Sequence, residues 1–415
     1  MPERALLLFD DDVARDFLPF TLTRPAGELV FGACLQRRRA ELTLGAHCLG
    51  HIAAAHLAAF EEPGAPPVRA TMPPAGTLSA PPPGTTDGPL VYLSSRAVPA
   101  WGAAPLERAP AVLTIGGEPC GWLAPPGGVP PAGFLRDPAS HAPAEVACHE
   151  LGGRLLRRVW ELVTLGEEQL ECDIAELAPA TARPDLPGVY VLGDGHVSLG
   201  AGVRIEPQVV LDTRHGPIWL DDGVTVNAFT HIWGPTYVGP RSTLLAEEIE
   251  GCSIGPVCRV HGQVECSFML GYDNKAHTGF LGHAYIGRWV NLGALTTNSD
   301  LKNNYGDVDI WTPGGIAATG QTKLGCLIGD HVKTGIALIL NTGTVMGAGC
   351  NLWGAELPPK HVPPFSWGCG SRLVAYDLEK FLGMAARAMA RRDVQLTESA
   401  AQQLRAAWQL GRAEA

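Results

Sequence analysis

Apolar residues in the second half of the chain recur every six positions. The three series are Val197, Val203 and Val209, then Leu220, Val226, Ile232, Val238 and Leu244, then Ile328, Thr334, Leu340, Met346 and Leu352. A period of six is typical of a short strand and a tight turn, repeated three times in each coil of a parallel β-helix. The strands of a β-sandwich, in contrast, recur about every 8 to 12 residues. The pattern therefore predicts a β-helix.

Two segments interrupt this period, one over 272–279 and a longer one over 298–323. Irregular insertions in a solenoid project from one face and often build the binding site. After the last coil, the residues from Tyr376 to Leu410 are rich in Ala, Arg, Leu and Gln. Their spacing predicts one or two amphipathic helices that pack on the coil or on a neighbouring subunit.

The first half of the chain begins as an α/β unit. A strand is predicted over Leu6 to Phe9, followed by three Asp residues, and a helix over Glu28 to Leu42. Residues 61–143 are dense in Pro and Gly, with strand-like runs at 89–93 and 111–115, and residues 144–178 have helical spacing. We predict a domain over 1–145, a helical linker over 146–190, a β-helix over 191–370 and a helical segment over 371–415.

Composition and charge narrow the class of protein. Of the 415 residues, 46% are hydrophobic and 18% charged, which is typical of a globular protein, and the 50 Gly and 35 Pro indicate many turns. A net charge of −11 argues against nucleic acid as a partner. The start of the chain has no signal peptide or membrane span, and the 11 Cys contain no CxxC pair. We therefore expect a cytoplasmic protein with neither disulfides nor membrane contact.

Polar residues gather where the six-residue period breaks. Within 271–308, a neutral imidazole at His277 is suited to take a proton from an attacking amine, and Asn side chains beside it are suited to hold a sugar. The candidate substrate-binding residues are Lys275, Asn291, Asn298, Lys302 and Arg259. Each has a plainer interpretation, because a turn histidine often bonds only to a loop carbonyl and a lysine or arginine is often only a solvated charge.

A metal is the other chemistry that this segment suggests. His277 and His283 are six residues apart, so they could bridge subunits through a metal ion. A zinc-dependent carbonic anhydrase of β-helix type would need three His with a closer pair, which His261, His277 and His283 match only loosely. We assign no metal ligands from the sequence.

The stretches GYDNKAHTGFLGHAYIGRWVNLGA and NSDLKNNYG resemble the acetyltransferase domain of the bifunctional enzyme that makes UDP-N-acetylglucosamine, and resemble more closely a group of sugar nucleotidyltransferases related to it. The resemblance implies a left-handed β-helix, His277 as the base that deprotonates an amino-sugar phosphate, and Asn291 as a sugar contact. Asn298 and Asp300 are alternatives for the second Asn of the family, because the loop lengths differ. It also implies acetyl-CoA as acyl donor, bound between the β-helices of a homotrimer. Phe280 stands where the family has Tyr.

The N-terminal stretch LLLFDDDVARDFLPFTLTRPAGELVFGACLQRR resembles the start of the same nucleotidyltransferase group, which implies a reduced, Rossmann-like domain. Nucleotide or phosphate binding would then fall to Asp10, Asp11, Arg15 and Arg24, with Mg²⁺ on Asp10 or Asp11 if this domain is active. The Gly-rich loop that usually wraps nucleotide phosphates is replaced here by three Asp. An alternative is that TRPAGEL only starts a helix.

The fold class predicted is thus an α/β nucleotidyltransferase-like domain followed by a left-handed parallel β-helix of hexapeptide repeats, with C-terminal helices. The favoured function is a transferase of nucleotide-sugar biosynthesis that moves an acetyl group from acetyl-CoA to an amino-sugar phosphate. The first alternative is sugar-1-phosphate nucleotidyl transfer in the N-terminal domain, with UTP or dTTP as substrate. The second is a non-catalytic ligand-binding homologue.

Overall fold

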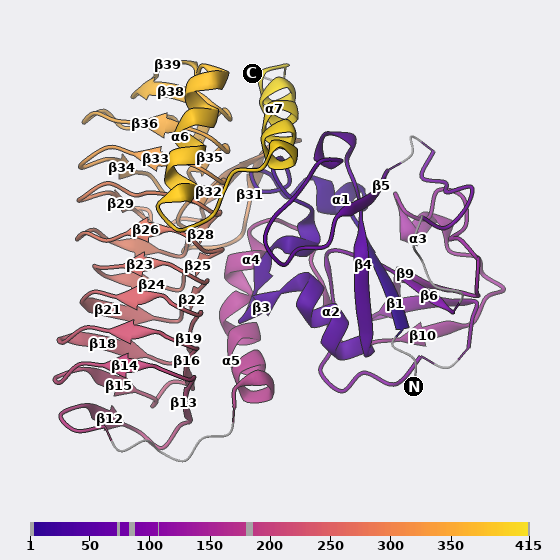
Figure 1. The fold of residues 1–415 in the computed structure, drawn as a ribbon, viewed down its shortest axis with the longest axis horizontal. Coiled ribbons are helices and arrows are strands. Elements are labelled where there is room, and N and C mark those ends of the chain that lie inside the picture. Colours follow the sequence, from indigo (N-terminus) through magenta and orange to yellow (C-terminus); the bar gives the residue numbers. More distant parts are fainter. Residues whose placement is uncertain (1–3, 73–74, 83–87, 107, 180–185, 414–415) are drawn as a thin grey trace.

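The computed structural model describes residues 4–72, 75–82, 88–106, 108–179 and 186–413. Figure 1 shows a stack of β-helix coils beside an α/β domain, with helices α4 and α5 between them and α6 and α7 at the far end of the stack. No helix among the described residues is long and apolar enough to cross a membrane. All 11 cysteines are free thiols.

The α/β domain is built on one mixed sheet. Its strands, in spatial order, are β10 (Cys148–Glu150), β8 (Ala111–Ile115), β9 (Glu118–Ala124), β6 (Leu90–Ser94), β1 (Arg4–Phe9), β4 (Ala46–Ala53) and β5 (Val68–Thr71). Strand β1 is parallel to both β4 and β6, and its residues from Ala5 to Phe9 are apolar, as expected for a strand that is buried on both faces. After β1 the chain first adds β4 and β5 on one side of it, and then returns to add β6 on the other side. The topological switch point therefore lies between β1 and β6.

Short elements complete this domain. The helices are α1 (Asp12–Arg15), η1 (Ala26–Glu28), α2 (Gln36–Leu44), η2 (Ala55–Leu57) and α3 (Pro138–His141), and the small strand pairs are β2 (Val30–Phe31) with β3 (Cys34–Leu35), and β7 (Ala97–Val98) with β11 (Arg154–Leu155). The predicted helix over 28–42 begins only at Gln36, because residues 30–35 form the β2–β3 hairpin. Helix α2 ends at Gly45, whose φ of 55° is left-handed.

The predicted linker is divided between the two parts. Strand β10 pairs with β8 and β11 pairs with β7, so residues 148–155 extend the α/β domain. Helices α4 (Glu161–Thr164) and α5 (Gly166–Leu177) follow, and α5 buries Leu170 and Ile174 next to Trp219 and Tyr237 of the β-helix. Residues 180–185 of the predicted linker lie outside the described residues.

Three faces of parallel strands form the predicted β-helix. The first face contains β12 (Tyr190–Leu192), β15 (Val210–Asp212), β18 (Thr230–Trp233), β21 (Glu247–Glu250), β24 (Val264–Glu265) and β27 (Leu281–Gly282), and the separate pair β29 (Thr297–Asn298) and β34 (Ile339–Leu340) lies further along the chain. The second face contains β13 (Val197–Leu199), β16 (Ile218–Leu220), β19 (Thr236–Val238), β22 (Ser253–Ile254), β25 (Phe268–Met269), β28 (Tyr285–Ile286), β32 (Leu327–Ile328), β35 (Val345–Met346) and β37 (His361–Val362).

The third face contains β14 (Arg204–Ile205), β17 (Thr225–Val226), β20 (Thr243–Leu244), β23 (Arg259–Val260) and β26 (Asn274–Lys275), then β33 (Lys333–Thr334), β36 (Asn351–Leu352) and β38 (Ser366–Cys369). The strand β39 (Arg372–Ala375) ends this sheet and is antiparallel to β38. The six-residue series predicted to point inward do so. Leu220, Val226, Ile232, Val238 and Leu244 are all fully buried in one continuous core. Stacking these side chains inside the coils supplies the hydrophobic stabilisation that one coil alone lacks.

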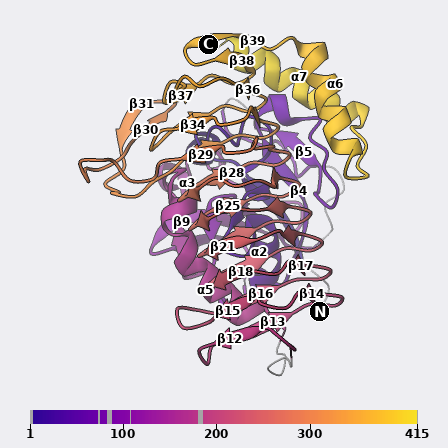
Figure 2. The ribbon, with the colours of Figure 1, turned by 90° about the vertical axis from the view of Figure 1, so that its left-hand side faces the viewer.

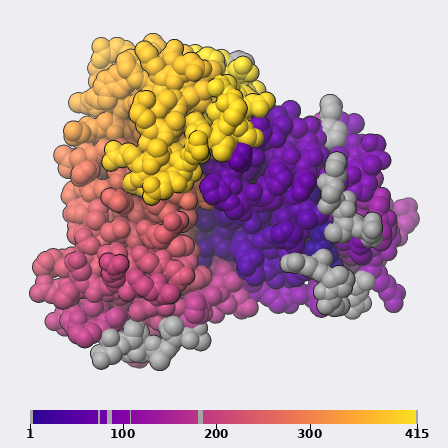
Figure 3. All heavy atoms as spheres, viewed as in Figure 1, coloured from indigo at the N-terminus to yellow at the C-terminus, as the bar shows by residue number. Residues whose placement is uncertain are grey.

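The longer interruption contains the hairpin β30 (Asp309–Thr312) and β31 (Gly315–Ala318), which projects from the stack in Figure 2. Helices α6 (Leu378–Ala390) and α7 (Glu398–Ala413) lie across the junction of the β-helix and the α/β domain (Figure 3). Tyr285 of the second face donates a hydrogen bond to the Val30 carbonyl at 2.8 Å, and its ring packs on Phe20. The two parts therefore form one packed body.

Candidate functional site

A ladder of polar side chains runs up the third face of the β-helix. Parallel pairing aligns Arg259 with Asn274, and single bridges continue the alignment through Asn291 to Lys333. The Asn274 side-chain amide donates to Asn291 Oδ1 at 3.0 Å, and Lys333 Nζ donates to the Trp289 carbonyl. Each of these residues precedes an inward-pointing one, so the pleat directs it out of the coil.

Helix α6 and the turn that follows it place three arginines over this ladder. Arg387, Arg391 and Arg392 line a cavity of about 350 Å³ together with Asn274, Asn291, Lys333, Tyr272 and Trp289. None of the described residues that line it is acidic. A concave site with four cations, two carboxamides and no carboxylate is suited to bind an anion such as a phosphate.

The electrostatic environment of the cavity appears in two pKa shifts. Burial lowers the pKa of Lys333 to about 8, against the opposing attraction of the buried Asp273 carboxyl. Burial, together with repulsion from Arg259 and Arg391, lowers the pKa of Arg392. In both cases burial, which penalises the charged form, is the largest cause of the lowered pKa, and a bound anion would favour the charged form again.

Lys275 does not face this cavity. It occupies the inward position that Leu244 and Val260 fill in the two preceding coils. Its Nζ donates to the carbonyl of His261 at 2.5 Å and to that of His277 at 3.2 Å, and burial lowers its pKa to about 8. The predicted substrate role of Lys275 is replaced by a structural one, because the buried amine holds the turn that carries His277.

His277 is exposed on the corner that follows β26. The backbone of this turn is joined to the coil above, since the Leu295 amide donates to the Thr278 carbonyl at 2.9 Å. Along the same edge stand the exposed side chains of Phe229, Leu295 and Ile336, of which Phe229 is 73% and Ile336 72% exposed. The candidate base therefore lies on an edge of the coil that also carries exposed apolar side chains.

The other candidates of the β-helix are placed differently. Arg259 is exposed at the lower end of the ladder. Asn298 is buried, where its amide donates to the Gly282 carbonyl and accepts from the Gly282 amide, both at 2.9 Å, so it joins two coils instead of facing a sugar. Lys302 donates to the Asp307 carbonyl and lies 3.3 Å from Asp309 within the insertion.

In the α/β domain, Asp11 occupies the switch point between β1 and β6. Its carboxylate caps α1 through the Ala14 amide at 2.8 Å, accepts from Ser94 at 2.8 Å, and forms an ion pair with Arg96 at 2.8 Å. Ligands of open α/β sheets usually bind at such a point. Here an internal ion pair fills it.

Arg24 is also committed to internal partners. It is 1% exposed and bonds to Asp330 of the β-helix at 2.7 Å and to Glu62 at 2.8 Å, while Arg288 reaches Glu62 at 2.7 Å. A phosphate would have to displace two carboxylates to reach this guanidinium. Arg24 thus joins the two parts of the molecule in a buried ion-pair network.

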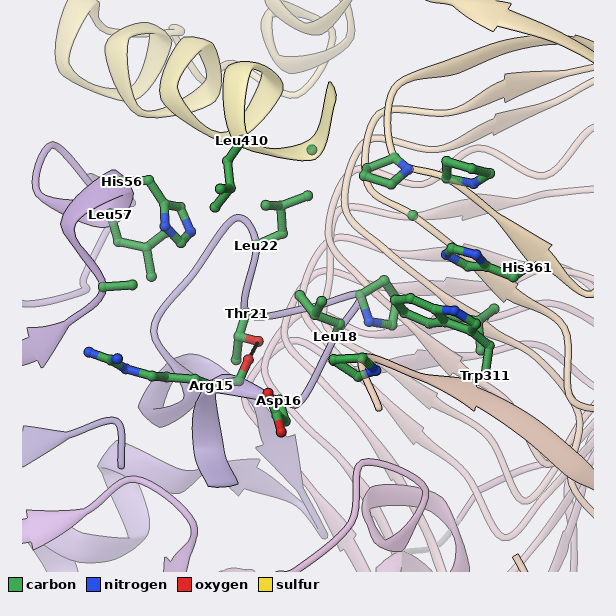
Figure 4. A pocket seen from close by; sticks show the side chains of 18 of the residues that line it. Arg15, Asp16, Leu18, Thr21, Leu22, His56, Leu57, Trp311, His361 and Leu410 are labelled. Atoms are coloured by element: carbon green, nitrogen blue, oxygen red, sulfur yellow. Dashed lines mark hydrogen bonds between the residues drawn. The ribbon is translucent and has the colours of Figure 1, made fainter. Parts of the chain in front are cut away.

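Asp10 and Arg15 line a second cavity, of about 430 Å³, between the α/β domain and the β-helix. Figure 4 shows Arg15 and His56 on the α/β side, Trp311 and His361 on the β-helix side, and Leu410 of α7 above. Trp311 stacks on His361 at 3.7 Å between ring centroids. Arg15 Nε and His56 Nε2 are buried without a hydrogen-bond partner among the described residues. This cavity is mainly apolar, with polar groups along one side.

These positions do not fit a magnesium ion. Arg96 neutralises Asp11, and burial raises the pKa of Asp10, which favours its protonated form. The Ala26 amide already donates to the Asp10 carboxyl at 3.2 Å. Magnesium prefers ionised carboxylates beside several waters, so we derive no step through Mg²⁺.

Sequence reasoning missed Lys333 and the three arginines at the C-terminal end of α6 and in the turn after it. Lys333 carried a usable signal, because it stands one residue before the inward Thr334, as Asn274 and Asn291 stand before their own inward neighbours. The arginines carried none, since only the packing of α6 on the third face brings them to the ladder.

A family model described as sugar nucleotidyl transferase matches residues 6–99. The chain is thus related in its N-terminal part to sugar nucleotidyltransferases. Among curated proteins it is 30% identical over 133 residues to the bifunctional protein GlmU of Nitrosospira multiformis, covering 27% of this chain and 28% of that one. It is 29% identical over 116 residues to the bifunctional sugar-1-phosphate nucleotidylyltransferase/acetyltransferase of Sulfurisphaera tokodaii, covering 28% and 27%.

These alignments span less than a third of the length of those two relatives. A longer alignment, to GlmU of Acidithiobacillus ferrooxidans, is 29% identical and covers 51% of this chain and 44% of that protein. Among solved structures, UDP-N-acetylglucosamine acyltransferase of Arabidopsis has a TM-score of 0.31 at 14% identity, over 50% of this chain and 78% of that one. The family model and the curated relatives confirm the resemblance to the bifunctional transferases found in the sequence.

Proposed function

We propose that this protein is a sugar-phosphate transferase of nucleotide-sugar biosynthesis, which transfers an acetyl group from acetyl-CoA to an amino-sugar phosphate on the β-helix. The observation that carries the proposal is the polar ladder under Arg387, Arg391 and Arg392, because this cavity offers several cations and amides and no acid to a phosphate-bearing ligand. The relation to the bifunctional nucleotidylyltransferase/acetyltransferases supports it.

His277 is the proposed base in this reaction. As the amine nitrogen attacks the acetyl carbonyl carbon, the exposed imidazole takes the amine proton, and the tetrahedral intermediate then collapses with cleavage of the C–S bond and release of the thiolate. Asn291 and Asn274 would orient the sugar, while Lys333 and Arg391 would hold phosphate oxygens. The basic cavity fits the phosphates of acetyl-CoA equally well, so the assay must separate donor from acceptor.

We also propose that the chain forms a homotrimer through the edge that carries His277. The exposed apolar side chains of Phe229, Leu295 and Ile336 support this, since apolar groups aligned on one edge are suited to be covered by another subunit. The acyl donor would then lie between neighbouring β-helices.

The test is thiol release from acetyl-CoA with glucosamine 1-phosphate as acceptor. His277→Ala should lower kcat by about 10² to 10⁴, the usual contribution of a general base, and Arg391→Gln should mainly raise KM for one of the two substrates. His196→Ala and Arg405→Gln, which change an exposed histidine and a half-buried arginine away from the cavity, should leave both constants unchanged. Thiol release that persists in His277→Ala would contradict the assignment of the base.

A second candidate function is nucleotidyl transfer in the α/β domain, favoured by the family match over residues 6–99 and by the cavity beside Asp10. Incubation with UTP or dTTP, a sugar 1-phosphate and Mg²⁺ should then release pyrophosphate, and Arg15→Ala should abolish this release. Absence of both pyrophosphate and thiol release would leave the non-catalytic alternative, in which the protein only binds ligands.

A further inference from the structure

Three potential metal ligands of different chemical type meet at one corner of the β-helix. Glu265, Cys266 and His283 each bring one ligand atom within 4.8 Å of the other two. Glu265 ends β24 and faces Gly282 of β27 in the parallel register, so Cys266 and His283 occupy the same corner in successive coils. Adjacent parallel strands are about 4.8 Å apart, which suits two ligands of one ion.

His283 is held in the manner of a metal-binding histidine. Its Nδ1 lies 2.8 Å from Asp300 Oδ2, and this contact fixes the orientation of the ring. The other ring nitrogen, Nε2, is not used in this contact. A carboxylate on the far nitrogen is the usual support of a histidine that binds zinc, because it orients the ring and raises its basicity. Asp300 belongs to the insertion over 298–323, so the coil and the insertion meet in this pair.

The corner also carries an excess of acidic groups. Glu250 is paired directly with Glu265 in the parallel register of β21 and β24, and the Glu167 carboxylate of α5 lies 3.5 Å from Cys266 Sγ. Lys323 offsets part of this negative charge, since its Nζ lies 2.9 Å from Glu265 Oε1. Like charges placed opposite each other in a sheet are destabilising, and a bound cation would relieve them.

We propose that Glu265, Cys266 and His283 bind one divalent transition-metal ion of the zinc class. Thiolate, imidazole and carboxylate together are a zinc-type ligand set, and an ion drawn to them needs ligand atoms roughly 3.3 to 3.8 Å apart, a small contraction from the observed spacing. The carboxylate of Glu167 or a water completes the tetrahedron. The ion would fasten α5, two coils and the insertion to each other, independently of any catalytic function.

The test uses Co²⁺ as a spectroscopic probe on the full-length protein after treatment with a chelator. Wild-type protein should bind one ion per chain and show a thiolate-to-cobalt absorption band, which Zn²⁺ should abolish by displacement. Cys266→Ser should remove the band and weaken binding at least tenfold. Cys172→Ser, which removes an exposed thiol from α5, should keep both. A wild-type protein without the band, or a band that survives in Cys266→Ser, would overturn the proposal.

The variant Asp300→Asn tests whether Asp300 orients His283 for metal binding or only stabilises the fold. Because Asp300 acts through His283, this variant should retain the thiolate band but bind Co²⁺ about 10- to 100-fold more weakly. Zinc should also raise the thermal midpoint of the wild-type protein, since a ligand that binds only the folded state stabilises it. Equal metal affinity in Asp300→Asn and wild type would contradict the assigned geometry even if Cys266→Ser were too unstable to study.

Discussion

Lys275 Nζ donates a hydrogen bond to the main-chain carbonyl of His277 at 3.2 Å from inside the coil. A lysine thereby fills a position in the β-helix core that aliphatic residues fill in the coils before it. Its ammonium group satisfies two carbonyls of the turn, and the cost of burying it appears as a pKa of about 8.

Lys275→Met should change how stability depends on pH. In the unfolded chain a lysine keeps a pKa of about 10.4, so between pH 8 and that value the unfolded state of the wild type binds more protons than the folded state. The free energy of unfolding of wild type relative to Lys275→Met should therefore rise with pH over this window, by up to about 3 kcal/mol. Urea denaturation at pH 7 and pH 10 measures it. Lys380→Met, on the exposed side of α6, is the control, and a pH-independent difference would refute the burial of the charge.

Lys333 should make coenzyme A binding sensitive to pH, if the proposed function is correct. Because its pKa is about 8, the amine loses its charge as the pH rises from 7 to 9, and the affinity for a polyphosphate ligand should fall by up to about tenfold. Lys333→Arg keeps its charge and should bind with little change over the same range. Titration calorimetry at both pH values is the measurement. A wild-type affinity that does not fall would exclude Lys333 from the anion site.

Removal of Arg24 should destabilise the whole molecule. Arg24→Ala leaves Asp330 buried without its guanidinium partner, and breaking a buried ion pair in this way costs about 3 to 5 kcal/mol. Arg405→Ala removes an exposed ion pair with Glu398 and should cost less than about 1 kcal/mol. Chemical denaturation of both variants makes the comparison. Equal losses would show that the network between the α/β domain and the β-helix contributes no stability.

Leu295→Glu should break the proposed trimer. A carboxylate on the edge that carries His277 would have to be buried against a neighbouring subunit, which costs more than leaving it in water. Light scattering after gel filtration should show trimers for wild type and monomers for the variant. Leu42→Glu changes an exposed leucine of α2 and should not alter the mass. A monomeric wild-type protein would reject the trimer directly.

Much of the β-helix was determined by the sequence alone. A coil of hexapeptides must present one inward side chain from each strand, so the spacing of Leu220, Val226 and Ile232 is sufficient to predict the fold without knowledge of any contact. The first strand and the C-terminal helices were predicted for the same reason, since each depends on a local pattern of apolar residues.

Only the tertiary structure decided which polar residues meet. The sequence grouped Lys275, His277, Asn291 and Asn298 because they are neighbours in the chain, but alternation along a strand turns Lys275 and Asn298 inward and leaves Asn291 outside. Arg387, Arg391 and Arg392 line the same cavity as Asn291 although they lie more than 90 positions away in the chain, and Arg24 bonds to Asp330 across 306 positions. Local periodicity fixes the direction of a side chain, whereas its partners depend on how distant segments pack, which no local pattern encodes.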